Sequence, residues 1–320
     1  MSRIEVFAPE GAPEIRSGDD LVEIVVPLLE LADGDVVVVT SKVISKAEGR
    51  VRAGTREAAL AEETVRVVAR RGGTAIVRTR QGLTMAAAGI DASNVEPGHV
   101  VLLPVDPDAS ARGLRTGLWH RTGRNVAVIV TDTAGRAWRE GQTDIAIGAA
   151  GLVVAESYAG RVDDYGNELE VTLPAVADEI AGAAELAQGK LGGRPFAVVR
   201  GRSDLVLPPG ENGLGAGSLV RADGADMFGY GAREAVVRAL RGDLADRPPF
   251  GAPAPAADLA AAITSTIGLI PSRSGPHGTE LLVTRPAGLK RPLAALAFAH
   301  GWDVLDLDSP SDVRLRPARP

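Results

Sequence analysis

Runs of β-branched residues alternate with charged and small-residue segments along the chain. Residues 36–39 are four valines in succession, which is typical of a strand covered on both faces of a sheet. Apolar stretches of strand length recur at 74–79, 99–105, 125–131 and 196–200. Charged or helically spaced segments predict helices at 55–71, 111–122, 174–189, 231–241 and 290–299. Strands that alternate with helices indicate a layered α/β or α+β fold.

Capping residues and glycines predict where some of these elements begin and end. Asp19 or Asp20 is expected to cap a helix that ends near Gly34, and Ser110 to cap the helix at 111–122. Residues 163–167 (DDYGN) have the composition of a β-hairpin turn. The loop LPPGENGLGAG, residues 207–217, is too rich in glycine and proline for regular structure. Such a loop either wraps a ligand with its backbone N–H groups or lies on the surface.

A Pro- and Ala-rich stretch, residues 247–258, is interpreted as a linker. We therefore expect a large domain of residues 1–246 and a small C-terminal extension of residues 259–320. That extension contains PSRSGPHGT, with His277 in a loop. A lone histidine in a loop is more often incidental than catalytic.

Composition narrows the classes of function. The 320 residues carry a net charge of −6, which does not favour nucleic acid as a partner, although a local basic site stays possible. The chain has no cysteine and only four histidines, so a metal is expected to be held by carboxylates and to be a hard ion. No stretch is long and apolar enough for a membrane span, and we expect a soluble cytoplasmic protein.

Hydroxyl and cationic side chains follow the valine strand directly, in TSKVISKAEGR at residues 40–50. Ligands of α/β sheets usually bind beyond such strand ends. Ser41 can donate a hydrogen bond to a phosphate oxygen, and Lys46 can neutralise its charge. The alternative is an exposed turn with solvated lysines, and spacing alone does not decide between the two. The glycine-rich P-loop pattern is absent.

Two further stretches place acidic residues beside the predicted strands. In AGIDASNVEPG, Asp91 and Asn94 form an oxygen cluster suited to a cation or a ribose, although an Asx-turn is the favoured alternative. In VIVTDTAGRAWREGQTDIAIG, Asp132 ends a strand and is placed to hold a nucleotide-bound metal. Arg136 and Arg139 follow and can clamp a carboxylate or phosphate, so a functional role is favoured here.

Several of these motifs together resemble the coenzyme F(420):L-glutamate ligase family. TSKVISKAEGR, GIDASNV, TDTAGRAWREGQTDIAIGAAG, YAGRVDDYGNELEVT, ADEIAGAAELAQGK and FAVVRG occur in that family's order and spacing, over residues 10–242. The resemblance implies an α+β fold with mixed sheets and flanking helices, an intertwined homodimer, and GTP-dependent addition of γ-linked glutamate to a deazaflavin coenzyme precursor. The tail resembles only a fragment of the nitroreductase domain found in a bifunctional form, so it is either a remnant or an unrelated extension.

The resemblance also implies roles for individual residues. Asp91, Asp132 and the adjacent Thr133 match ligands of a divalent metal, Mg²⁺ or Mn²⁺, and K⁺ is a further expected cation. The positions that match contacts to GTP are Pro13, Glu14, Ile15, Ser41, Lys46 and Asn94.

Amide formation in water needs an activated acid, which leads to a hypothesis for the mechanism. The substrate carboxylate attacks the γ-phosphate of GTP, and the amine of L-glutamate then displaces phosphate from the acyl phosphate. Arg136 or Arg139 is expected to hold a substrate carboxylate. Two alternatives stay open, namely a non-catalytic regulator that binds GTP or the coenzyme, and a related ligase with another carboxylate acceptor.

Overall fold

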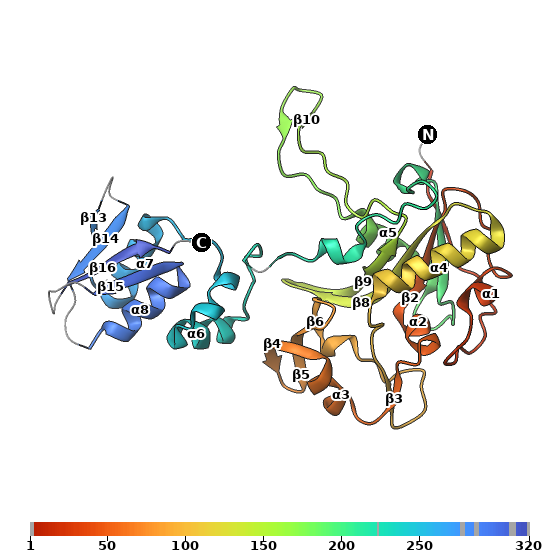
Figure 1. Ribbon diagram of the computed structural model, residues 1–320, viewed down its shortest axis with the longest axis horizontal. Helices are drawn as coiled ribbons and strands as arrows, with labels where there is room; N and C mark the ends of the chain where they lie inside the picture. The colour runs from red at the N-terminus through yellow and green to blue at the C-terminus, as the bar shows by residue number, and fades with distance from the viewer. Residues whose placement is uncertain (1–2, 223, 276–278, 285–287, 307–311, 319–320) are drawn as a thin grey trace. The chain divides into compact units, whose positions relative to one another are not determined.

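The computed structural model describes residues 3–222, 224–275, 279–284, 288–306 and 312–318 (Figure 1). The chain divides into two compact units, Met1–Val220 and Arg221–Pro320. Each unit contains helices, sheet and its own hydrophobic core, which confirms the expected α+β class. His277, noted in the sequence, lies outside the described residues.

A five-stranded mixed sheet forms the centre of the first unit, in the order β1-β12-β2-β8-β9. Its strands are β1 (Glu5–Phe7), β12 (Phe196–Arg200), β2 (Val36–Thr40), β8 (Ala127–Arg136) and β9 (Arg139–Ala150). Strands β2 and β8 run parallel, and the other neighbouring pairs are antiparallel. The strands predicted from the valine run and from residues 125–131 and 196–200 are therefore confirmed.

The valines of β2 are fully buried because helices cover both faces of this sheet. Side chains of successive strand residues point to opposite faces. Val37 and Val39 accordingly pack in one core with residues of α4 (Pro107–Thr122), while Val36 and Val38 pack in the other with residues of α5 (Val176–Gln188). Packing on both faces fixes the position of the strand ends, where the candidate side chains lie.

Aspartate side chains cap the starts of two helices in the first unit. Asp20 accepts a hydrogen bond from the backbone of Val22 and caps α1 (Leu21–Val25). Helix α4 begins earlier than predicted, because Asp106 caps it through the backbone N–H of Ala109 and Ser110 already lies inside it. Helix α2 (Ser41–Ala47) starts directly where β2 ends.

Among the described helices, none has the length and apolar character that crossing a membrane requires.

A side layer of short elements packs beside the main sheet. Its members are β3 (Val51–Ala53) paired with β7 (His99–Val101), α3 (Arg56–Glu63), η1 (Ala87–Gly89), and the sheet of β4 (Thr64–Arg71), β5 (Thr74–Thr79) and β6 (Thr84–Ala86). The helix predicted at 55–71 is thus wrong in its second half. From Thr64 onward, β-branched residues pair with β5 instead. The predicted turn at 163–167 is confirmed, because it joins β10 (Arg161–Val162) to β11 (Glu168–Leu169).

The glycine-rich loop at 207–217 is irregular, as predicted, and it is tied to helix α4. The side chain of Asp108 accepts hydrogen bonds from the backbone N–H groups of Ala216 and Gly217, at 2.8 and 3.1 Å. Arg115, from the same helix, donates to carbonyl groups at the loop's beginning. Short 3-10 helices flank the loop at η2 (Ser203–Leu205) and η3 (Ala216–Leu219). These backbone N–H groups are therefore engaged by the protein itself.

The second unit is a small α+β domain. Its elements are α6 (Ala232–Arg241), η4 (Leu244–Asp246), η5 (Pro248–Phe250), α7 (Ala256–Ile267), β13 (Ser272–Ser274), β14 (Glu280–Thr284), α8 (Lys290–Ala299), β15 (Trp302–Asp306) and β16 (Asp312–Pro317). The strands form an antiparallel sheet in the order β13-β14-β16-β15. Its core joins α7 and α8 to this sheet through Leu259, Leu293 and the buried Trp302.

The division between the units differs from the sequence expectation. It falls at Val220/Arg221, whereas a linker was expected at 247–258. That stretch contains η5 and the start of α7, and the ring of Phe250 contacts those of Tyr230 and Phe298. Proline and alanine dominate this segment because it makes a tight turn and begins a helix.

Candidate active site

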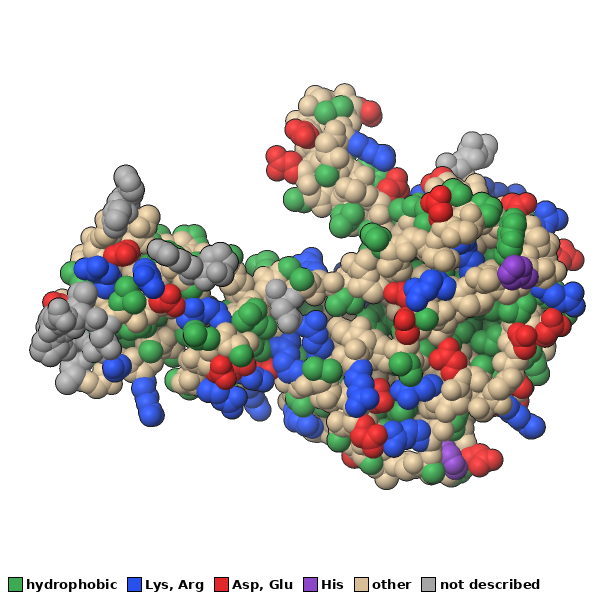
Figure 2. Space-filling model, in the orientation of Figure 1, with side chains coloured by type: hydrophobic (Ala, Val, Ile, Leu, Met, Phe, Trp, Pro, Cys, Tyr) green, Lys and Arg blue, Asp and Glu red, His purple; other side chains and the backbone are tan. Residues whose placement is uncertain are grey.

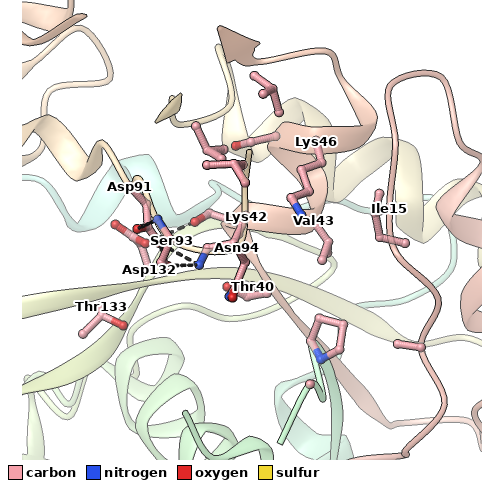
Figure 3. Close-up of a pocket in the computed structure, with 18 of the residues that line it drawn as sticks. Ile15, Thr40, Lys42, Val43, Lys46, Asp91, Ser93, Asn94, Asp132 and Thr133 are labelled. Atoms are coloured by element: carbon pink, nitrogen blue, oxygen red, sulfur yellow. Dashed lines mark hydrogen bonds and ion pairs between the residues drawn. The ribbon is translucent and has the colours of Figure 1, made fainter. Parts of the chain in front are cut away.

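A cleft of about 1530 Å³ opens in the first unit, at the ends of the parallel strands β2 and β8 (Figure 3). Because Thr40 pairs with Thr131 in the parallel register, the residues that follow them, Ser41 and Asp132, also become neighbours. The hydroxyl of Ser41 donates to Oδ1 of Asp132 at 3.2 Å. The register of the two strands thus places the carboxylate of Asp132 beside Ser41 at the end of the sheet.

Asp91 reaches the same end of the cleft from the side layer. Its backbone forms a β-bridge with Val101, which holds it in place. The ammonium group of Lys42 lies 2.6 Å from Oδ2 of Asp91. Since Lys42 follows Ser41 directly, consecutive residues of α2 contact the two aspartates, and Figure 3 shows both carboxylates in one group. The structure therefore brings Asp91 and Asp132 together.

The expected Asx-turn at Asp91 is also present. Its Oδ1 accepts the backbone N–H of Ser93 at 2.7 Å, and its Oδ2 accepts the hydroxyl of Ser93 at 2.8 Å. The two alternatives considered for this residue therefore coexist, because the turn orients a carboxylate that also lines the cleft. Burial raises the pKa of Asp91, but the hydrogen bonds from Lys42 and Ser93 outweigh it and leave that pKa lowered.

Asp132 has the opposite electrostatic character. Burial raises the pKa of its carboxyl to about 7, and the nearby charges of Asp144 and Asp91 push it the same way against the hydrogen bonds from Ser41 and Thr133. A cation close to this carboxyl would lower its pKa and favour the anion. Within the described residues, no group of three or more acidic or histidine side chains forms a complete metal site.

Two carboxylates with open coordination nevertheless fit a hard divalent ion that also binds phosphate. Mg²⁺ characteristically takes one or two carboxylates from the protein and completes its shell with water and substrate phosphate oxygens. Asp91 and Asp132 supply that number, and the side chain of Thr133 follows Asp132 along the cleft (Figure 3). The donor set is therefore compatible with the metal that the sequence led us to expect.

A second polar cluster lies beside Asp132 and was not assigned from the sequence. Asp144, on β9, is buried and accepts hydrogen bonds from the hydroxyls of Thr131 and Thr133 at 3.2 and 2.7 Å. The ammonium group of Lys190 lies 2.8 Å from Oγ1 of Thr133 and 3.3 Å from Oδ1 of Asp144, and it also pairs with Glu185. The segment ADEIAGAAELAQGK supplied a family likeness but no chemical pattern that singles out Lys190.

The residues expected to contact GTP line the same cleft. They are Pro13, Glu14, Ile15, Ser41, Lys46 and Asn94. The side chain of Lys46 is only 9% exposed, and its ammonium group lies 2.5 Å from Oε1 of Glu14. Lys46 is thus a buried cation rather than the solvated lysine of the alternative interpretation. Asn94 has a positive φ of 55°, which Asn tolerates better than most residues.

Arg136 and Arg139 do not lie in this cleft. They face each other at the end of the β8–β9 hairpin, and both are exposed. Arg136 donates to the backbone carbonyl of Glu140 at 2.9 Å. Strands β8 and β9 continue well beyond the end of β2, so these arginines are carried away from the strand ends that hold Asp132. The described residues that line the cleft include neither arginine.

The raised pKa of Asp132 predicts a dependence of stability on pH in metal-free protein. A group whose folded pKa lies above its unfolded value stabilises the fold below the unfolded pKa, and this stabilisation is lost as pH rises through the folded pKa of about 7. Between about pH 5 and pH 8, the free energy of unfolding of the wild type should fall relative to that of Asp132→Asn by on the order of 3 kcal/mol. Urea unfolding in EDTA at both pH values measures this, and parallel pH profiles would contradict it.

Comparison with known proteins finds the same family that the sequence motifs resemble. A family model described as F420-0:Gamma-glutamyl ligase matches residues 11–61 and 55–201, which contain the whole lining of the cleft. A protein named Coenzyme F420:L-glutamate ligase from Archaeoglobus fulgidus is 44% identical over 62% of this chain and 88% of its own length. Proteins of the same name from Methanopyrus kandleri and Haloarcula marismortui are 38% and 40% identical, over 67% and 62% of this chain and 93% and 87% of their own lengths. With more than half of its residues matched by the model, the chain belongs to the F420-0:gamma-glutamyl ligase family.

Proposed function

We propose that this protein is a GTP-dependent ligase that adds L-glutamate, through a γ-linkage, to the deazaflavin precursor of coenzyme F420. The observation that carries the proposal is the pair of carboxylates, Asp91 and Asp132, which distant segments bring to one end of a large cleft. Family membership and the names of the relatives supply the substrate class. We place the reaction in the cytoplasm.

The nucleotide is proposed to lie between α2 and the segment around Glu14. The buried ammonium group of Lys46 offsets phosphate charge, and its ion pair with Glu14 holds it ready when no nucleotide is present. Ser41 donates to a phosphate oxygen, while Pro13, Ile15 and Asn94 line the remaining wall. The volume of about 1530 Å³ leaves room for the second substrate beside the nucleotide.

Asp91, Asp132 and Thr133 are proposed to hold Mg²⁺ or Mn²⁺, and K⁺ is proposed as a further cation of the reaction. The divalent ion, when bound, supplies charge stabilisation to the phosphate oxygens of GTP. The protein keeps Asp91 ionised through Lys42 and Ser93. Before the nucleotide binds, it holds Asp132 toward the same point through the hydroxyl of Ser41, which then donates to the phosphate instead.

The proposed reaction has two steps. A carboxylate oxygen of the precursor attacks the γ-phosphorus of GTP, the bond to the β-phosphate oxygen breaks, and GDP leaves. The amine nitrogen of L-glutamate then attacks the acyl carbon, phosphate leaves, and the amine loses its proton as the amide forms. The described side chains supply positioning and charge rather than a nucleophile, which suits a chain without cysteine.

Cations are needed wherever the acceptor carboxylates bind. Lys190 lines the cleft beside Thr133 and is well placed for this role. Because Arg136 and Arg139 lie outside the cleft of their own chain, they can hold a substrate carboxylate only by reaching the cleft of another copy. Their role thus depends on the homodimer, which we retain as part of the proposal.

Two other functions make different predictions. A regulator that binds GTP or the coenzyme without turnover would retain the cleft and its charges but consume no GTP. A related ligase would use another carboxylate as acceptor. The closely placed carboxylates of Asp91 and Asp132 favour turnover over binding alone, because a nucleotide-binding regulator does not need charge concentrated at the reacting phosphate.

The direct test is incubation of the protein with the deazaflavin precursor, GTP, Mn²⁺ and L-glutamate. We expect GDP to form only when precursor and glutamate are both present, and the product mass to increase by whole glutamyl residues. Nucleotide analysis and mass spectrometry measure the two outcomes. GTP that stays intact would favour the regulator, and a product only with another acid would favour the related ligase.

A further inference from the structure

A separate cavity of about 420 Å³ lies wholly within the second unit, and the family match does not reach it. It opens between the end of α6, helix α8 and the strands β15 and β16. Four arginines line it, namely Arg241, Arg247, Arg291 and Arg316. Figure 2 shows several basic side chains on the visible face over α6.

The positive charge of this cavity is only partly neutralised. Asp303 is the single acidic residue among the described residues of the lining. It binds Nη1 of Arg247 at 2.8 Å and lies 3.8 Å from Nε of Arg316. One carboxylate facing four guanidinium groups leaves an excess of three positive charges around a small volume. Such an excess favours an anionic ligand.

Two guanidinium groups also have unused donors. The Nε atoms of Arg247 and Arg316 are buried and have no hydrogen-bond partner within the described part of the chain. The 3.8 Å between Nε of Arg316 and Asp303 is too long for a hydrogen bond. A buried donor without an acceptor is costly, and a carboxylate or phosphate oxygen would remove this cost. This observation is independent of the charge count.

The remaining wall of the cavity is apolar. Phe298, Trp302 and Leu305 line it, and the guanidinium group of Arg247 lies 5.0 Å from the centre of the Phe298 ring. That stacking limits the orientations available to Arg247. A ligand that matches both walls carries several negative groups joined by short hydrocarbon segments. Chains of dicarboxylic acid units have this character, whereas inorganic phosphate has no part that fits the apolar wall.

We propose that this cavity is a binding site for an oligocarboxylate, specifically for the γ-linked glutamyl chain that the proposed reaction extends. The identity of the ligand rests on the proposed function, because each γ-linked glutamate keeps one free α-carboxylate and adds two methylene groups. The arginines then engage successive carboxylates, and the apolar wall contacts the methylene groups. The C-terminal unit thereby acts as a holder of anionic product.

Trp302 provides a local probe for a test on the full chain. The other tryptophans, Trp119 and Trp138, are 41% and 87% exposed, so replacing both by phenylalanine leaves Trp302 as the only tryptophan at little structural risk. We expect γ-linked triglutamate to change the fluorescence of this protein with saturation. Inorganic phosphate and L-glutamate should bind at least tenfold more weakly.

Variants identify the site. Arg241 and Arg291 are exposed, and their joint replacement Arg241→Gln/Arg291→Gln should weaken triglutamate binding at least tenfold. Arg233→Gln, an exposed arginine on the same helix α6 outside the cavity, is the matched control and should bind normally. Arg247→Gln should also weaken binding, provided that its thermal unfolding matches the parent.

Three outcomes overturn the proposal: no fluorescence change with triglutamate, equal binding by the Arg241→Gln/Arg291→Gln variant, or phosphate binding as tight as triglutamate. The titration needs no turnover and is therefore distinguishable from the ligation assay. Binding by a protein that fails to ligate supports the site and contradicts the proposed function. Ligation without triglutamate binding supports the proposed function and contradicts the site.

Discussion

Replacing Asp132 with asparagine is expected to lower the rate of GDP formation about 10²–10³-fold, the size of losing one preorganised electrostatic group at a reacting centre. Asparagine keeps the shape of the side chain, and its amide oxygen can still accept the hydrogen bond from Ser41. The variant removes only the negative charge that we propose binds the metal. Its fold should be at least as stable as that of the wild type, since burial disfavours this charge.

Asp178 offers a matched control for this substitution. It is also an aspartate whose pKa is raised by burial, and it accepts the backbone N–H of Ala146 at 2.9 Å, but it does not line the cleft. Asp178→Asn should therefore retain near-normal turnover. GTP affinity measured with and without Mn²⁺ completes the comparison, because only Asp132→Asn should lose the metal-dependent part. Full activity of Asp132→Asn at ordinary metal concentration would contradict the assignment.

The main sheet was predictable because its signal is local. An uninterrupted valine run has no polar face, which is typical of a strand covered on both sides, and Val36 to Val39 are fully buried. The end of that run also indicated where Ser41 would lie. The partner of Ser41, in contrast, depends on the register between β2 and β8, which no pattern within either segment specifies. Only the family resemblance linked Asp91 to Asp132.

Tertiary structure decides the positions that sequence reasoning did not foresee. Arg136 and Arg139 follow Asp132 closely in sequence, but the long β8–β9 hairpin carries them outward, away from the cleft. Lys190 was missed for the converse reason. It follows a helix in which alanine is the commonest residue, and only the packing of α5 against β9 brings it to Thr133.

The predicted helix and strand boundaries were wrong where tertiary contacts outweighed the intrinsic propensity of the residues. Residues 64–71 are as charged as a surface helix, yet they form β4 because strand β5 offers them a partner. The linker expected at 247–258 reflected composition alone, and the aromatic contacts of Phe250 could not be foreseen from it. Composition specifies what a segment can do, and packing decides among those options.

Replacing Arg115 with methionine is expected to have the largest effect on stability, about 3–5 kcal/mol in the free energy of unfolding. The side chain of Arg115 is almost fully buried on α4, and methionine replaces its aliphatic part without its donors. Its guanidinium group donates to the carbonyl oxygens of Val126, Leu207, Pro208 and Glu211 and to the side chains of Asn125 and Asn212. The substitution removes all of these hydrogen bonds. The carbonyl groups of Leu207 and Pro208 keep donors in Asn125 and Glu211, whereas the other acceptors lose the donor that Arg115 supplies.

Arg112 on the same helix supplies the control, because its side chain is 43% exposed and makes only a 3.6 Å ion pair with Asp106. Arg112→Met should change the free energy of unfolding by less than about 1 kcal/mol. Urea unfolding measures both variants, and limited proteolysis should cut Arg115→Met first within residues 207–217. If Arg115→Met unfolds like Arg112→Met, then hydrogen bonds from α4 do not hold the glycine-rich loop. That loop would then owe its order to its own backbone and to Asp108, whose contacts with Ala216 and Gly217 would remain.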